Sequence, residues 1–96
     1  MKKSEKIVKQ ICQVINQKGL HARAAAQIVT LSNQYQSELT LTHKNKSACG
    51  LSLIKLLTLD APLGSNISIS IEGIDAEHAS QAINRLFING FGELDK

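Results

Sequence analysis

Aromatic residues are scarce in this chain of 96 residues, which has no tryptophan, two phenylalanines and one tyrosine. The apolar residues, 43% of the chain, must therefore build a core that is mainly aliphatic. A chain of this length is expected to form one domain, covering residues 1–96. Ligand pockets usually occupy several hundred Å³, which leaves little room for a deep active site in so small a domain. We therefore expect any chemistry to lie at the surface.

Long apolar runs and paired cysteines are also missing. No run of about 18 apolar residues occurs, which excludes a membrane-spanning helix. A secretory signal needs an uninterrupted apolar stretch after its basic residues, and here Lys9 and Gln10 interrupt that stretch. No secretory signal is therefore expected, and the predicted location is the cytoplasm. Cys12 and Cys49 match no metal-binding spacing and are predicted to be reduced core residues. No metal site and no membrane association are expected.

The formal charge of +3 is mild, and the lysines are not interleaved with aromatic residues. Proteins that bind single-stranded nucleic acid combine a basic groove with aromatic stacking platforms. The charge alone leaves an α+β nucleic-acid-binding domain open as one interpretation, but the stacking residues are missing. We expect acidic protein partners, and no nucleic acid.

Hydrophobic periodicity predicts elements in the order β-α-β-β-α-β-α. Ile67, Ile69 and Ile71 alternate with serines in the clearest strand, and a 3.6-residue period marks the last helix, for which Asp75 is the expected N-cap. Residues 1–6 are expected to be a frayed extension of the domain. The pattern predicts an α+β open-faced sandwich, one sheet covered on one face by helices. The predicted segments are strands at 7–15, 37–43, 46–49 and 66–72 and helices at 22–33, 52–59 and about 76–89.

His21 lies between the first predicted strand and the first predicted helix, with Arg23 two residues later. The first N–H groups of a helix have no intrahelical partner, and the helix dipole favours an anion there. An imidazole is a nucleophile that titrates near neutral pH, and a guanidinium binds phosphate through several donors. The spacing is typical of a histidine that takes up a phosphoryl group. The residues alone, however, favour a surface histidine with an incidental arginine neighbour, because His-x-Arg is a common tripeptide.

Residues 19–26, with the sequence GLHARAAA, resemble the active-site signature of the histidine-containing phosphocarrier protein (HPr) family of the bacterial phosphotransferase system. The resemblance extends over about residues 9–91 and includes the predicted element order, so it implies an HPr-like, mainly antiparallel four-stranded sheet with three helices. Short strings at 56–60 and 86–91 look more like the nitrogen-related branch, NPr, than the sugar-transport branch. Ala24 departs from the family pattern, which usually has proline there.

The resemblance implies a role for each residue of the signature. His21 would accept a phosphoryl group on Nδ1 from phosphorylated enzyme I and pass it to a histidine of an enzyme IIA component. Arg23 would bind the phosphate as it arrives and leaves. No cofactor is implied, and a small carrier that docks several partners is expected to be a monomer.

Ser52 falls on the position that an HPr kinase phosphorylates in some family members, although its hydroxyl is equally suited to cap the short helix that follows. Leu53, Ile54 and Leu57 are expected to form an exposed apolar patch for partner docking, with a core position as the alternative for Leu57. His43 and His78 are interpreted as solvated residues without a role.

Two functions of different classes follow. The favoured one is a phosphoryl carrier, which is not a free-standing enzyme. The alternative is a regulatory binding module that acts through the apolar patch, with phosphorylation of Ser52 as a possible switch and His21 secondary.

Overall fold

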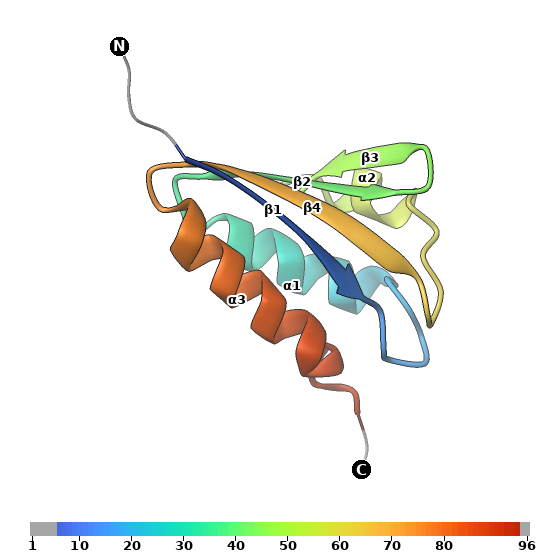
Figure 1. Cartoon of the computed structure of the whole chain (residues 1–96). Coiled ribbons are helices and arrows are strands. Elements are labelled where there is room, and N and C mark those ends of the chain that lie inside the picture. Colours follow the sequence, from blue (N-terminus) through green and yellow to red (C-terminus); the bar gives the residue numbers. More distant parts are fainter. Residues whose placement is uncertain (1–5, 95–96) are drawn as a thin grey trace.

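The computed structural model of the chain describes residues 6–94. Its helices and strands follow the predicted order, with one short 3₁₀ turn, η1, after the last helix (Figure 1). None of the described helices is long and apolar enough to cross a membrane. The elements are β1 (Lys6–Gln13), α1 (Ala22–Ser32), β2 (Glu38–His43), β3 (Lys46–Cys49), α2 (Leu53–Leu57), β4 (Asn66–Gly73), α3 (Ala76–Ile88) and η1 (Gly90–Gly92).

The four strands form one sheet in the order β1-β4-β2-β3, and each neighbouring pair is antiparallel. Figure 1 shows α1 and α3 beneath the same face of this sheet, and the two helices contact each other. The short helix α2 packs against α1 and β3. The predicted α+β open-faced sandwich is confirmed, and its sheet is wholly antiparallel.

Aliphatic side chains fill the core, as the shortage of aromatic residues predicted. Ile67, Ile69 and Ile71 of β4 are at most 1% exposed, whereas Ser68 between them is exposed. The two-residue period of the strand therefore separates a core face from a solvent face. The other elements add further buried side chains: Ile28, Leu39, Leu41, Leu56, Ile83 and Phe87.

Strand β1 carries apolar residues on both faces, and only one face meets the helices. Cys12 is buried on the helix side, whereas Ile7 and Ile11 lie on the open face, 56% and 69% exposed. The inward set includes the polar Gln10, whose side-chain amide donates to the Ser80 carbonyl and whose Oε1 accepts from the Ser80 hydroxyl. Helix α3 thus satisfies a polar side chain that would otherwise be costly to bury.

The start of the chain differs from the prediction by one residue. Residues 1–5 of the expected frayed extension lie outside the described residues. Lys6, expected in the same extension, is instead the first residue of β1, because it pairs with Gly73 at the end of β4. At its other end β1 stops at Gln13, two residues early, since Gln13 already pairs with Asn66, the first residue of β4.

Asp75 occupies the N-cap position of α3, but its side chain does not cap that helix. Its carboxylate accepts hydrogen bonds from the backbone N–H groups of Gln36 and Ser37, at 2.9 Å each, and from the Ser37 hydroxyl. These bonds, led by that of the Ser37 hydroxyl, hold the pKa of Asp75 below its usual range. Asp75 therefore ties the start of α3 to the loop before β2.

The interpretation of His43 as a solvated residue is wrong. It is the last residue of β2, is 7% exposed, and its Nδ1 lies 2.8 Å from the carbonyl oxygen of Leu59. His78 is exposed on α3, as predicted. Both cysteines are free, Cys12 buried and Cys49 half-buried, and burial raises the pKa of the Cys12 thiol.

Candidate functional site

The loop before α1 is held in one conformation by Asn16 and Gly19. Gly19 has φ +67°, a conformation that L side chains rarely adopt, and its N–H donates to the Asn16 carbonyl at 3.1 Å. A Cβ added there would lie 2.5 Å from the carbonyl oxygen of Ala61. The next residue, Leu20, is buried and donates its N–H to that same oxygen at 2.9 Å. The segment 60–62 therefore fixes where the chain enters α1.

His21 is the N-cap of α1, in extended backbone conformation. Its carbonyl accepts from Ala25 N–H at 2.9 Å, and its ring Nδ1 accepts from Arg23 N–H at 3.3 Å. A histidine ring here takes the place that a serine or aspartate oxygen commonly has, satisfying one of the unpaired N–H groups of the first turn. As a result Nδ1 faces the positive end of the helix dipole.

The other ring nitrogen of His21, Nε2, lies 2.6 Å from Oε2 of Glu93. Glu93 follows η1, so its carboxylate comes from a segment 72 residues away along the chain. Sequence reasoning missed this residue and Asn16. The glycines Gly90 and Gly92 indicate that the last helix ends there, but not that the chain returns to His21.

Asn16 holds Glu93 in place. Its side chain is fully buried, and its Nδ2 donates to Glu93 Oε1 and to the Gly19 carbonyl, at 2.9 Å each. Burial alone would raise the pKa of Glu93. This effect is outweighed by the hydrogen bonds from Asn16 and His21 and by the charges of His21 and Lys18, so the pKa of Glu93 lies below its usual range. Glu93 is therefore an anion at neutral pH.

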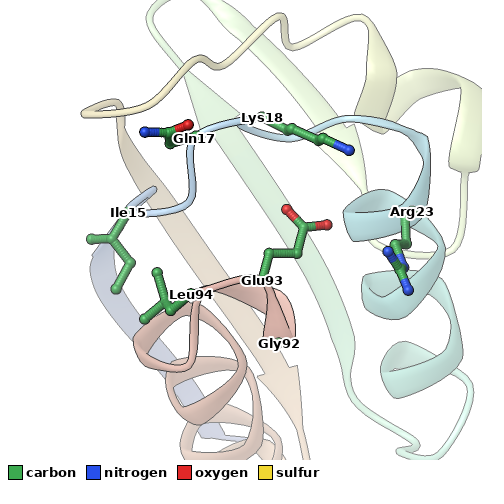
Figure 2. Close-up of a pocket in the computed structure, with 7 residues that line it drawn as sticks. All are labelled: Ile15, Gln17, Lys18, Arg23, Gly92, Glu93 and Leu94. Carbon is green, nitrogen blue, oxygen red and sulfur yellow. The ribbon is translucent and has the colours of Figure 1, made fainter. Parts of the chain in front are cut away.

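A hollow of about 500 Å³ lies beside Glu93, lined by Ile15, Gln17, Lys18, Arg23, Gly92, Glu93 and Leu94. Figure 2 shows the Glu93 side chain between the loop that carries Lys18 and the start of α1 that carries Arg23. The Arg23 side chain is exposed, and no ion pair engages its guanidinium within residues 6–94. The hollow is thus bordered by two cationic side chains and by the Glu93 carboxylate, and the exposed guanidinium of Arg23 at the first turn of α1 is the group in it that is suited to bind phosphate.

Ala24, where the family pattern usually has proline, is the third residue of α1 and is fully buried. At this position a residue has no intrahelical acceptor for its N–H group. A proline would have no N–H there, so alanine adds one donor to the helix start that borders the site.

Ser52 is the N-cap of α2, and its hydroxyl accepts from Lys55 N–H at 3.2 Å. Beside it, Leu53, Ile54 and Leu57 are 40%, 74% and 39% exposed. The buried apolar residue of α2 is Leu56, not Leu57, so the three predicted docking residues all reach the surface. Because α2 packs against α1, this apolar patch adjoins the helix that His21 caps.

No cluster of three or more metal-ligating side chains occurs within residues 6–94. His21 is a partly exposed nucleophile whose Nδ1 faces a helix N-terminus and whose Nε2 faces a carboxylate.

A family model described as the PTS HPr component phosphorylation site matches residues 8–89. The chain belongs to the HPr family of phosphocarrier proteins of the phosphotransferase system.

Relatives of both branches of the HPr family resemble this chain. A phosphocarrier protein HPr of Xylella fastidiosa is 39% identical over 80 residues, which cover 83% of this chain and 90% of the relative. A phosphocarrier protein NPr of Proteus mirabilis is 42% identical over 79 residues, covering 81% and 88%. The crystal structure of HPr from Thermoanaerobacter tengcongensis superposes with a TM-score of 0.86 at 30% identity, over 92% of this chain and 99% of that one. The HPr fold is thus confirmed together with the family.

Proposed function

We propose that this HPr-family protein carries a phosphoryl group on Nδ1 of His21, accepting it from phosphorylated enzyme I and passing it to a histidine of an enzyme IIA component. The observation that carries the proposal is the position of the imidazole as the N-cap of α1, with Nδ1 facing the Arg23 N–H. A phosphoryl group added to Nδ1 would meet that N–H and the positive end of the helix dipole.

The electrostatic support in this site is modest, as a carrier requires. Arg23 is exposed, so its guanidinium can follow the phosphate in and out. The side chain of His21 is 26% exposed, which lets a donor and an acceptor reach the ring in turn. A site that enclosed the phosphate completely would hold the group and slow its onward transfer.

Partner docking is assigned to the apolar patch of Leu53, Ile54 and Leu57. The patch lies on α2, which packs against α1, so a protein seated on it would lie next to the helix that presents His21. Burying the apolar area that these side chains still expose, which is largest on Ile54, would favour association. The basic residues Lys18 and Arg23 nearby favour acidic partners.

The test is phosphorylation by phosphoenolpyruvate and a matching enzyme I, followed by intact mass spectrometry. We expect one acid-labile phosphoryl group on the wild type and none on His21→Ala. The matched control is His78→Ala, which removes an exposed histidine from α3 and should be phosphorylated like the wild type. An unmodified wild type, or an adduct that persists in His21→Ala, would overturn the proposal.

The second candidate function is regulation by protein contact, and the exposure of Ile54 favours it. In that case a pull-down should survive His21→Ala and be lost in Leu53→Asp. Leu63→Asp, at a 52% exposed leucine outside α2, is the matched control and should retain the partner. Loss of the partner in His21→Ala would argue against this candidate.

Ser52 phosphorylation by an HPr kinase belongs to the same candidate. The added charge would lie beside Leu53 and Ile54 and would oppose docking. Incubation with ATP and an HPr kinase, with Ser52→Ala as the control, tests this step, and phosphate retained in Ser52→Ala would contradict it.

The proposal treats the protein as a cytoplasmic monomer without nucleic-acid ligands. Two free cysteines agree with a reducing compartment. One solved HPr of Thermoanaerobacter tengcongensis is described as a dimer. Light scattering at several concentrations should give the mass of one chain, and a mass of two chains would correct this part.

A further inference from the structure

The two hydrogen bonds of the His21 ring select one tautomer. Arg23 N–H can only donate, so Nδ1 accepts and carries no proton. An ionised carboxylate can only accept, so Nε2, which lies 2.6 Å from Glu93 Oε2, must be the donor. Both contacts therefore require the tautomer with hydrogen on Nε2 and a lone pair on Nδ1, the atom proposed to accept the phosphoryl group.

Glu93 is held against His21 by an unusual piece of backbone. Gly90, Phe91 and Gly92 have φ values of +58°, +57° and +75°. A left-handed conformation is rare for a bulky residue such as phenylalanine and is retained only where the surroundings impose it. The Phe91 ring is buried 4.9 Å from that of Phe87, and the Phe91 carbonyl accepts from Gln27 of α1 at 3.0 Å.

Asn16 completes this support from the opposite side. It is fully buried, and one amide group bonds both the loop that leads to His21 and the carboxylate of Glu93. The Glu93 side chain is 14% exposed, less than the ring that it contacts. Lys18 on the loop and Arg23 on α1 line the hollow beside this pair, and the charge of Lys18 favours the ionised carboxylate.

We propose that Glu93 is a positioning residue for phosphoryl transfer, which keeps the hydrogen of His21 on Nε2 and balances the charge that the ring gains when Nδ1 is phosphorylated. This inference rests on the proposed function of His21. It assigns a task to a residue outside the GLHARAAA segment, supplied by the end of the chain that follows η1.

The transfer step balances without any movement of a proton. The Nδ1 lone pair forms the N–P bond, while the bond from phosphorus to the phosphorylated donor side chain breaks and its electron pair leaves with the donor. The ring of His21 keeps its Nε2–H and becomes an imidazolium, whose positive charge faces the Glu93 carboxylate at hydrogen-bond distance.

In onward transfer the N–P electron pair returns to Nδ1, and the ring leaves as a neutral imidazole with hydrogen still on Nε2. Because the ring keeps its Nε2 hydrogen, it leaves as a neutral imidazole and not as an imidazolate. The charge of the carboxylate itself stabilises the phosphorylated ring, and so favours uptake over release. The arrangement resembles the way a carboxylate orients a catalytic histidine in a hydrolase triad.

The experiment compares Glu93→Gln with the wild type in two independent measurements. Long-range proton–nitrogen NMR correlations of the ¹⁵N-labelled protein report the tautomer of the His21 ring. Single-turnover transfer from phosphorylated enzyme I reports the rate constant. Glutamine keeps the size and an acceptor oxygen but has no charge, and its amide can turn to donate to Nε2. Glu72→Gln makes the same charge change at an exposed position of β4 and is the matched control.

We expect the wild type and Glu72→Gln to show hydrogen on Nε2 alone, and Glu93→Gln to show a share of the Nδ1–H form. Loss of one charge-assisted hydrogen bond predicts a transfer rate constant roughly 10- to 100-fold lower in Glu93→Gln. A wild-type ring with hydrogen on Nδ1, or Glu93→Gln transferring at the wild-type rate, would overturn the inference. If the wild type is not phosphorylated at all, the proposed function fails, while the NMR measurement still decides the tautomer.

Discussion

Replacement of Gly19 by alanine tests whether the loop that presents His21 depends on one close approach of two backbone segments. The φ of +67° costs an alanine about 1–2 kcal/mol relative to its preferred conformations. The new methyl group would also lie 2.5 Å from the Ala61 oxygen and 2.9 Å from Pro62 Cα. Both neighbours are backbone atoms, so they cannot avoid the methyl group by a change of rotamer.

The two effects together predict a destabilisation of about 2–5 kcal/mol, since overpacking typically costs about 1–3 kcal/mol. In a domain of this size that corresponds to a fall in melting temperature of roughly 10–40 °C. Urea denaturation followed by circular dichroism measures the free energy of unfolding directly, and an unchanged m-value confirms that the unfolded state is the same.

Gly92→Ala is the matched control for this experiment. Gly92 has a similar φ of +75°, but a Cβ there meets no atom within 4 Å. Gly92→Ala should therefore lower the free energy of unfolding only by the cost of the backbone conformation, about 1–2 kcal/mol. Equal destabilisation by the two variants would refute the argument, because it would show that the contact of Gly19 with Ala61 contributes nothing.

Three further predictions concern the fold around the site. Because the pKa of Asp75 is lowered in the folded state, its contribution to stability is complete above about pH 5 and is lost as the pH falls through the folded-state pKa. Asp75→Asn should therefore remove this part of the loss of melting temperature between about pH 7 and 3. A melting temperature that falls with pH in parallel in the two proteins would contradict this prediction. Phe87→Ala should lower the free energy of unfolding by about 3–5 kcal/mol in chemical denaturation, because Phe87 is 1% exposed. Ile88→Ala, at a 60% exposed position, should lower it far less, and a similar loss in both variants would contradict the packing. Ser52→Ala should lower the free energy of unfolding by about 1 kcal/mol, because the hydrogen bond from Lys55 N–H is lost. Ser52→Asp should recover most of this stability in the same assay, and no loss in Ser52→Ala would rule out the capping role.

The amino-acid sequence by itself determined the order and type of the elements. Strand β4 and helix α3 have strong two-residue and 3.6-residue periods, which depend on local geometry alone. The position of His21 was predictable for the same reason, since a polar residue between a strand and an alanine-rich helix is well placed at the helix start. The predicted exposure of Leu53 and Ile54 also holds, because α2 is too short to bury more than one side.

The tertiary structure alone decided which of two apolar faces of β1 is buried and what His43 and Asp75 contact. The chain carries Ile7 and Ile11 on one face of β1 and Cys12 on the other, and the second face is buried because α3 packs there. The tertiary structure also decided the contact of Glu93 with His21, which joins residues 72 positions apart through the turn at η1. Local periodicity reports how a segment meets its own neighbours along the chain, whereas these contacts depend on how distant segments pack around a shared core.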